Sequence, residues 1–79
     1  MGKKARIKRW NEEAITILAL NVRKYRLAKG YTIKELSNLM GADYSQIGRL
    51  ERGVANPHIS IIFDIAIALE IEPARLLER

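Results

Sequence analysis

Apolar residues recur at helical spacing along the first part of the sequence. Between residues 11 and 29, those that repeat at intervals of three or four are Ile15, Leu18, Val22 and Tyr25. This interval places side chains on one face of an α-helix. Gly30 comes next, and glycine is favoured just past a helix end because it adopts left-handed backbone at little cost. The pattern predicts an amphipathic helix over about residues 11–29.

Two further helices are predicted by the residues that can cap them. The segments 32–35 and 43–46 each begin with Thr or Asp and end with Glu or Gln. In such a capping box both side chains bind backbone amides at the start of a helix. Gly41 lies between the two predicted helices, and Gly53 follows the second. Two short helices joined by a tight turn with glycine are typical of a helix-turn-helix, expected here at about residues 33–52.

The apolar stretch from residue 59 to residue 71 fits two kinds of element. Its odd-numbered positions are all apolar, as in a half-buried β-strand. A helix would instead turn one stripe toward the core, made of Ile59, Ile62, Phe63, Ala66 and Leu69. Periodicity leaves both alternatives open, although a single strand would have no partner in an otherwise helical chain. Beyond this stretch, Pro73 suits the first position of a short final helix.

Composition narrows the class of protein. Its 79 residues suffice for one small domain, expected over residues 11–79 behind a basic arm at residues 1–10. With no cysteine and one histidine, the chain is expected to hold no metal and no other cofactor. Paired carboxylates, an activated nucleophile and a glycine-rich phosphate loop are not recognisable, so an enzyme is not expected. The absence of a long apolar run excludes a membrane-spanning helix and favours a cytoplasmic location.

Charge is unevenly distributed along the chain. Residues 1–34 contain ten Lys and Arg and two acids, whereas residues 35–79 contain four Arg and seven acids. The basic residues of the arm are Lys3, Lys4, Arg6, Lys8 and Arg9. This asymmetry indicates an anionic partner, most commonly nucleic acid. The arm is then either a solvated tail or a segment that contacts DNA phosphates.

Taken together, residues 18–78 resemble the phage-repressor/Cro-like helix-turn-helix family, also called the xenobiotic-response-element type. The resemblance rests on Arg26, the capped helix after Thr32, Gly41, Ile47, Glu51-Arg52-Gly53 and Asn56-Pro57. It implies an all-α, compact five-helix bundle, and therefore a helix in the stretch after residue 59. It also implies a sequence-specific regulator of transcription that reads the major groove of double-stranded DNA with the helix at about 44–52.

The resemblance implies roles for individual residues. Those expected to read bases are Tyr44, Ser45, Gln46 and Arg49. Those expected near DNA phosphates are Thr32, Ile33, Lys34, Arg52 and Asn56. Arg26 and Glu51 are expected to form a structural ion pair that sets the angle of the reading helix. Asp43 is expected mainly to cap that helix, Gly48 to lie on its exposed face, and His58 to be a loop or capping residue without a chemical role.

A surplus of apolar residues near the end of the chain predicts a homodimer. The residues expected at its interface are Ile61, Ile65, Ile67, Ala68, Leu76 and Leu77. A twofold dimer would bind a palindromic operator, as a restriction-modification controller or a phage-type repressor does. The alternative is an antitoxin-type interaction module that binds a partner toxin. RNA polymerase is a further candidate partner, through Glu35.

Overall fold

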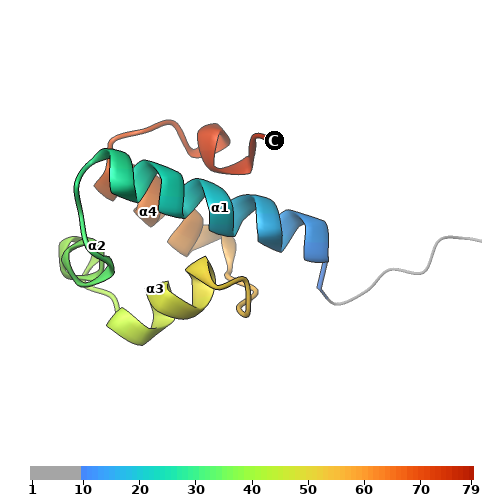
Figure 1. Ribbon diagram of the computed structural model, residues 1–79, viewed down its shortest axis with the longest axis horizontal. Coiled ribbons are helices and arrows are strands. Elements are labelled where there is room, and N and C mark those ends of the chain that lie inside the picture. Colours follow the sequence, from blue (N-terminus) through green and yellow to red (C-terminus); the bar gives the residue numbers. More distant parts are fainter. Residues whose placement is uncertain (1–9) are drawn as a thin grey trace, which may run out of the picture.

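The computed structural model describes residues 10–79, which are entirely helical and irregular (Figure 1). The elements are α1 (Glu12–Ala28), α2 (Ile33–Met40), α3 (Tyr44–Glu51), α4 (Ile59–Leu69) and the 3-10 helix η1 (Pro73–Leu77). The all-α class is thereby confirmed. The expected count of five α-helices is wrong for the described part of the chain, because the segment after Glu72 forms a single 3-10 helix. Residues 1–9, nearly all of the predicted basic arm, lie outside the described residues.

The helix-turn-helix forms where the capping pattern predicts it. The Thr32 hydroxyl accepts from the Glu35 amide at 3.0 Å, and the Glu35 carboxylate accepts from the Thr32 amide at 2.8 Å. Gly41 then ends α2 in the left-handed region at φ 68°. The second capping box is wrong, because the Asp43 side chain makes no capping hydrogen bond. Only the backbone carbonyl of Asp43 accepts at the start of α3, from the amides of Gln46 and Ile47.

The ambiguous stretch after residue 59 forms a helix, α4, and it turns a partly different face inward from the one predicted. Its buried residues are Ile61, Ile65, Ala66 and Leu69. Two members of the predicted core stripe, Ile59 and Phe63, are instead 61% and 50% exposed. The strand alternative is therefore wrong. The expected core stripe is confirmed for Ala66 and Leu69, which are fully buried, and wrong for Ile59 and Phe63.

One core joins all the described elements. Figure 1 shows α1 running along the bundle, with α3 on one side of it and η1 on the other. The core residues contributed by the different elements are Leu18, Val22, Leu36, Ile47, Leu50, Ile65, Leu69 and Leu76. Ser37 is also buried, and its hydroxyl donates to the Lys34 carbonyl at 2.8 Å, so its polar group is satisfied.

The end of the described chain is tied to α1 by polar contacts. The Asn21 side-chain amide donates to the carbonyls of Leu76 and Glu78 at 2.9 and 2.7 Å. Ion pairs join Lys29 to Glu70 and Arg79 to Glu13. The Asn21 hydrogen bonds hold η1 against α1, on the opposite side of that helix from α3 (Figure 1).

Candidate nucleic-acid interface

An ion pair joins the end of α3 to α1. Arg26 donates from Nε to Glu51 Oε2 at 2.6 Å and from Nη2 to Glu51 Oε1 at 2.9 Å. Its Nη1 donates to the Tyr31 carbonyl at 2.7 Å. Both side chains are nearly inaccessible, at 7% and 4% exposure. The hydrogen bond to Glu51 raises the pKa of Arg26 above its ordinary value. The predicted contact between Arg26 and Glu51 is present, and its role in setting the angle of α3 stays a prediction.

The packing of α3 separates a core face from a solvent face. Ile47 and Leu50 are buried, at 0% and 2% exposure, and anchor the helix to the core. The four residues predicted to read bases, Tyr44, Ser45, Gln46 and Arg49, are all exposed. The helix therefore presents an aromatic ring, a hydroxyl, an amide and a guanidinium to solvent, which are groups that can bind base edges.

A pocket of about 840 Å³ lies between the start of α2 and the start of α3, and we call it the α2 pocket. Its lining residues are Arg26, Thr32, Ile33, Lys34 and Tyr44. Three predicted phosphate-contact residues thus meet one predicted base reader here. The first backbone amides of a helix carry partial positive charge and have no partner within the helix. Together with the Lys34 ammonium they suit a phosphate group.

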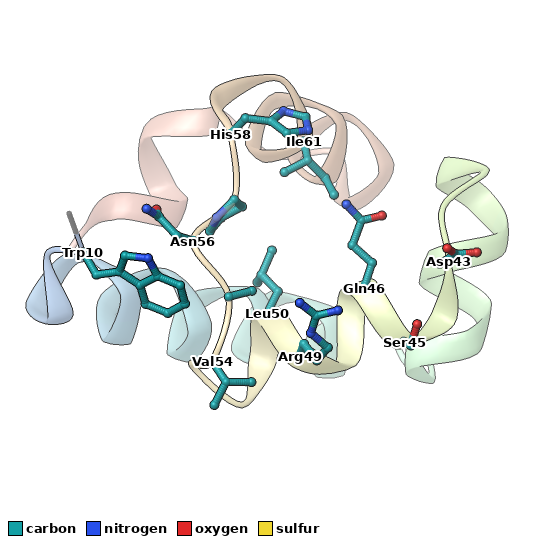
Figure 2. Close-up of a pocket in the computed structure, with 12 residues that line it drawn as sticks. Trp10, Asp43, Ser45, Gln46, Arg49, Leu50, Val54, Asn56, His58 and Ile61 are labelled. Carbon is teal, nitrogen blue, oxygen red and sulfur yellow. The ribbon is translucent and has the colours of Figure 1, made fainter.

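A second depression of about 640 Å³, which we call the α3 groove, lies between α3 and the loop that leads to α4 (Figure 2). The polar and aromatic side chains that line it include Gln46 and Arg49 from α3, Asn56 and His58 from the loop, and Trp10 at one end. Ser45 and Asp43 lie at the opposite end from Trp10 (Figure 2). The groove therefore joins three predicted base readers with the predicted phosphate contact Asn56.

Two groove residues were not expected at the site. His58, expected only as a loop or capping residue, directly precedes α4, and its imidazole lies over the groove near Ile61 (Figure 2). Trp10, the last residue of the predicted basic arm, also lines the groove. The chain returns from α3 past the start of α1, and this long-range arrangement brings both residues to the reading helix.

Gly48 departs from its expected place on the exposed face of α3, and the side chain of Arg52 lies beside it. Gly48 is buried rather than exposed. A Cβ atom there would lie 3.3 Å from Nη1 of Arg52, so the arginine side chain folds back over this glycine. Arg52 lines neither the α2 pocket nor the α3 groove. Arg52 is nevertheless exposed, and its phosphate contact stays a prediction.

The charge of the described residues is balanced. Residues 10–79 contain nine Lys and Arg and nine Asp and Glu, so the formal charge of +5 comes entirely from residues 1–9. The folded domain offers DNA local cationic groups, such as Lys34 and Arg49, but no overall positive charge.

The predicted dimer interface is largely wrong in its membership. Ile61, Ile65 and Leu76 are at most 5% exposed because they pack into the core of this chain. Ala68 is partly buried, whereas Ile67 and Leu77 are 72% and 52% exposed. The exposed apolar residues of α4 are Ile59, Phe63 and Ile67, which follow one another at intervals of four. We call these three residues the α4 stripe.

The fold and the exposed polar face of α3 define a helix-turn-helix domain of the DNA-binding, transcription-regulator type. The chain belongs to the helix-turn-helix family, whose sequence pattern matches residues 22–76. None of the helices within residues 10–79 is long and apolar enough to cross a membrane.

Several known proteins are similar to this chain. It is 34% identical over 58 residues to the HTH-type transcriptional regulator SlrR of Bacillus subtilis (strain 168), covering 72% of this chain but only 38% of SlrR. The crystal structure of the restriction-modification controller protein C.AhdI from Aeromonas hydrophila matches with a TM-score of 0.76 and 37% identity, covering 78% of this chain and 94% of C.AhdI. The hypothetical transcription factor NHTF from Neisseria matches with a TM-score of 0.81 and 29% identity, covering 95% and 87% of the two chains.

Proposed function

We propose that this protein regulates transcription by binding double-stranded DNA in a sequence-specific manner, with the first half of α3 in the major groove. The observation that carries the proposal is the arrangement of α3. Ile47 and Leu50 anchor it to the core, while Tyr44, Ser45, Gln46 and Arg49 face solvent. A helix held in this way can enter the groove without losing core contacts, as the second helix of a helix-turn-helix does.

Two of the exposed groups match particular base edges. The Arg49 guanidinium can donate two parallel hydrogen bonds to O6 and N7 of guanine. The Gln46 amide can donate and accept at N7 and N6 of adenine. The α2 pocket would meanwhile hold a phosphate through the first amides of α2 and Lys34, which fixes the position of α3 along the duplex.

Similarity to C.AhdI favours one biological setting. That protein is a restriction-modification controller, and the match covers 94% of its length, so this chain resembles it as a whole rather than in one motif. We propose that this chain acts as a small regulator of the same kind or as a phage-type repressor. Selection of bound duplexes from a random pool tests whether the protein binds DNA in a sequence-specific manner. A protein that selects no motif would contradict the proposed function and favour the toxin-binding alternative.

Arg49→Ala is expected to weaken binding to the selected site by about 1–3 kcal/mol and to relax base preference at one position, because a bidentate contact to guanine is lost. Lys34→Ala is the matched control and should weaken binding to all duplexes alike, since phosphates carry no sequence information. Repeating the selection with both variants measures the difference. An unchanged motif with Arg49→Ala would show that α3 does not read bases in this orientation.

Deletion of residues 3–9 is expected to flatten the salt dependence of DNA binding. Each phosphate contact contributes about 0.9 to the slope of log K against log salt concentration. All five excess positive charges of the chain lie in residues 1–9, so the arm is the main candidate source of this term. Titrations at several salt concentrations measure the slope, and an unaltered slope would identify the segment as a solvated tail.

We further propose that the protein binds as a homodimer through the α4 stripe. Ile59, Phe63 and Ile67 are 61%, 50% and 72% exposed, and three neighbouring apolar side chains on one helix face favour a protein contact. A twofold axis through this surface would set two reading helices about 34 Å apart, one turn of DNA. The operator would then be close to palindromic.

A further inference from the structure

Among residues 10–79, Gly48 is the one glycine inside a helix, and it lies in the middle of α3. Glycine destabilises a helix relative to alanine, because the unfolded chain has more freedom to lose at a glycine. The other glycines of this part of the chain adopt positive φ, whereas Gly48 does not. Its backbone therefore does not require glycine, and the missing side chain needs another explanation.

The guanidinium of Arg52 occupies the space beside Gly48. Residues four apart lie on the same side of a helix, and side chains lean toward its N-terminus, so Arg52 can reach back over Gly48. Its Nη1 lies 3.3 Å from the position that a Cβ atom of residue 48 would take. Gly48 is buried although Arg52 itself is exposed. A larger side chain at position 48 would push the guanidinium away from the helix.

The charge of Arg52 is not neutralised by an acid. The ion pairs among residues 10–79 join other residues, and the neighbouring Glu51 is bound to Arg26. The guanidinium is thus held beside the backbone of α3 with its charge available to an anion. Such a planar group suits a phosphate, which it can bind through two parallel hydrogen bonds.

The side of α3 on which this cation lies points to the kind of contact that it makes. Tyr44, Gly48 and Arg52 follow one another at intervals of four, so they form one row along the helix. Tyr44, at the start of this row, lines the α2 pocket, which we propose to hold a DNA phosphate. Arg52 therefore lies on the flank of α3 that faces the DNA backbone rather than the base edges.

We propose that Gly48 is a positioning residue, which lets Arg52 lie flat along α3 and bind a DNA phosphate on this flank. The proposal rests on the proposed DNA-binding function. A guanidinium that already lies along the helix loses less conformational freedom on binding than one that extends into solvent. It also leaves α3 free to approach the duplex closely. The stability that glycine costs α3 is thus offset by tighter binding to DNA.

A double-mutant cycle tests the proposal, using the full chain, Gly48→Val, Arg52→Ala and both changes together. Gly48→Val fills the space beside the guanidinium, and we expect it to weaken binding to the selected duplex about threefold to tenfold and to lower the salt slope by about 0.9. In the Arg52→Ala background the same substitution should change neither quantity, because no guanidinium remains to be positioned. The selected motif should be the same for all four proteins, since phosphates carry no sequence information.

Thermal unfolding separates this effect from a loss of fold. Gly48→Ala adds only a Cβ atom, which the flexible end of Arg52 can accommodate, so it should raise the melting temperature by about 4–8 °C and weaken binding less than valine does. Asn38→Ala is the matched control, because Asn38 is exposed on α2 and the substitution also favours helix without altering Arg52. This control should leave DNA binding unchanged.

Each other outcome overturns the proposal. Equal weakening by Gly48→Val with and without Arg52 would mean that residue 48 itself approaches DNA. No weakening would leave Gly48 without a role in binding, and a lower melting temperature for Gly48→Ala would make the glycine a packing requirement. A changed motif with Arg52→Ala would make that residue a base reader. If the full chain selects no duplex, the proposed function fails as well, whereas a selected motif without coupling between residues 48 and 52 contradicts this inference alone.

Discussion

Replacing Glu51 by alanine is expected to lower the free energy of unfolding by about 3–5 kcal/mol, because the substitution leaves a buried cation without its counter-ion. The Arg26 side chain is 7% exposed and would keep only its hydrogen bond to the Tyr31 carbonyl. An arginine guanidinium stays protonated at any pH at which proteins are folded, so Arg26 cannot shed its charge when Glu51 is lost. Small domains are stable by about 5–15 kcal/mol, and this loss is a large part of that.

Urea denaturation followed by circular dichroism measures the effect, and two controls show its origin. Glu13→Ala removes the exposed ion pair to Arg79 and should change stability far less, since solvent screens such pairs. Arg26→Met combined with Glu51→Leu removes both charges and should recover much of the loss, because apolar residues can replace a buried ion pair. A Glu51→Ala protein with the stability of the parent would show that this pair does not hold α3 in place.

Local signals in the sequence were sufficient for the helix-turn-helix. The capping box at Thr32 and Glu35 involves residues three apart, and Gly30 and Gly41 adopt the positive φ that the pattern requires. Such features depend on the nearest turn of backbone, so the sequence carries them without reference to the rest of the fold. Asp43 shows the limit of such local predictions, because its side chain can cap a helix but makes no capping hydrogen bond in the structure.

The orientation of α4 could not be predicted for a physical reason. Only Ser60 and Asp64 are polar between residues 59 and 69, so the polar face of the helix is narrow and most of its circumference is apolar. The buried side is chosen by packing against α1, α2 and η1, which selects Ile61, Ile65 and Leu69. The same packing leaves the α4 stripe outside, including Ile59 and Phe63, which were predicted to face the core.

Some residues of the candidate site could be predicted from the sequence, and others could not. The family resemblance proposed residues on α3 and at the start of α2, and these are exposed around the two depressions. The contributions of Trp10 and His58 depend on the loop after α3 passing close to the start of α1. Contacts between segments so far apart in sequence leave no periodic trace in a single chain.

Ile67→Glu is expected to convert the proposed dimer into a folded monomer and to abolish tight binding to a two-half-site operator. Ile67 is 72% exposed, so within one chain a glutamate there would remain in water and leave the core intact. In a twofold dimer the same surface meets its own copy, and two carboxylates would enter one apolar interface. The desolvation and repulsion of these charges would oppose association.

Sedimentation measures the change as a fall from twice 9.0 kDa to 9.0 kDa, with circular dichroism as the check on folding. Leu27→Glu is the matched control, because Leu27 is 53% exposed on α1 and lies outside the α4 stripe, so this variant should stay dimeric. Ile65→Glu should instead unfold the chain, since Ile65 is 0% exposed. An Ile67→Glu protein that stays dimeric would exclude the α4 stripe as the interface, and one that unfolds would place Ile67 in the core.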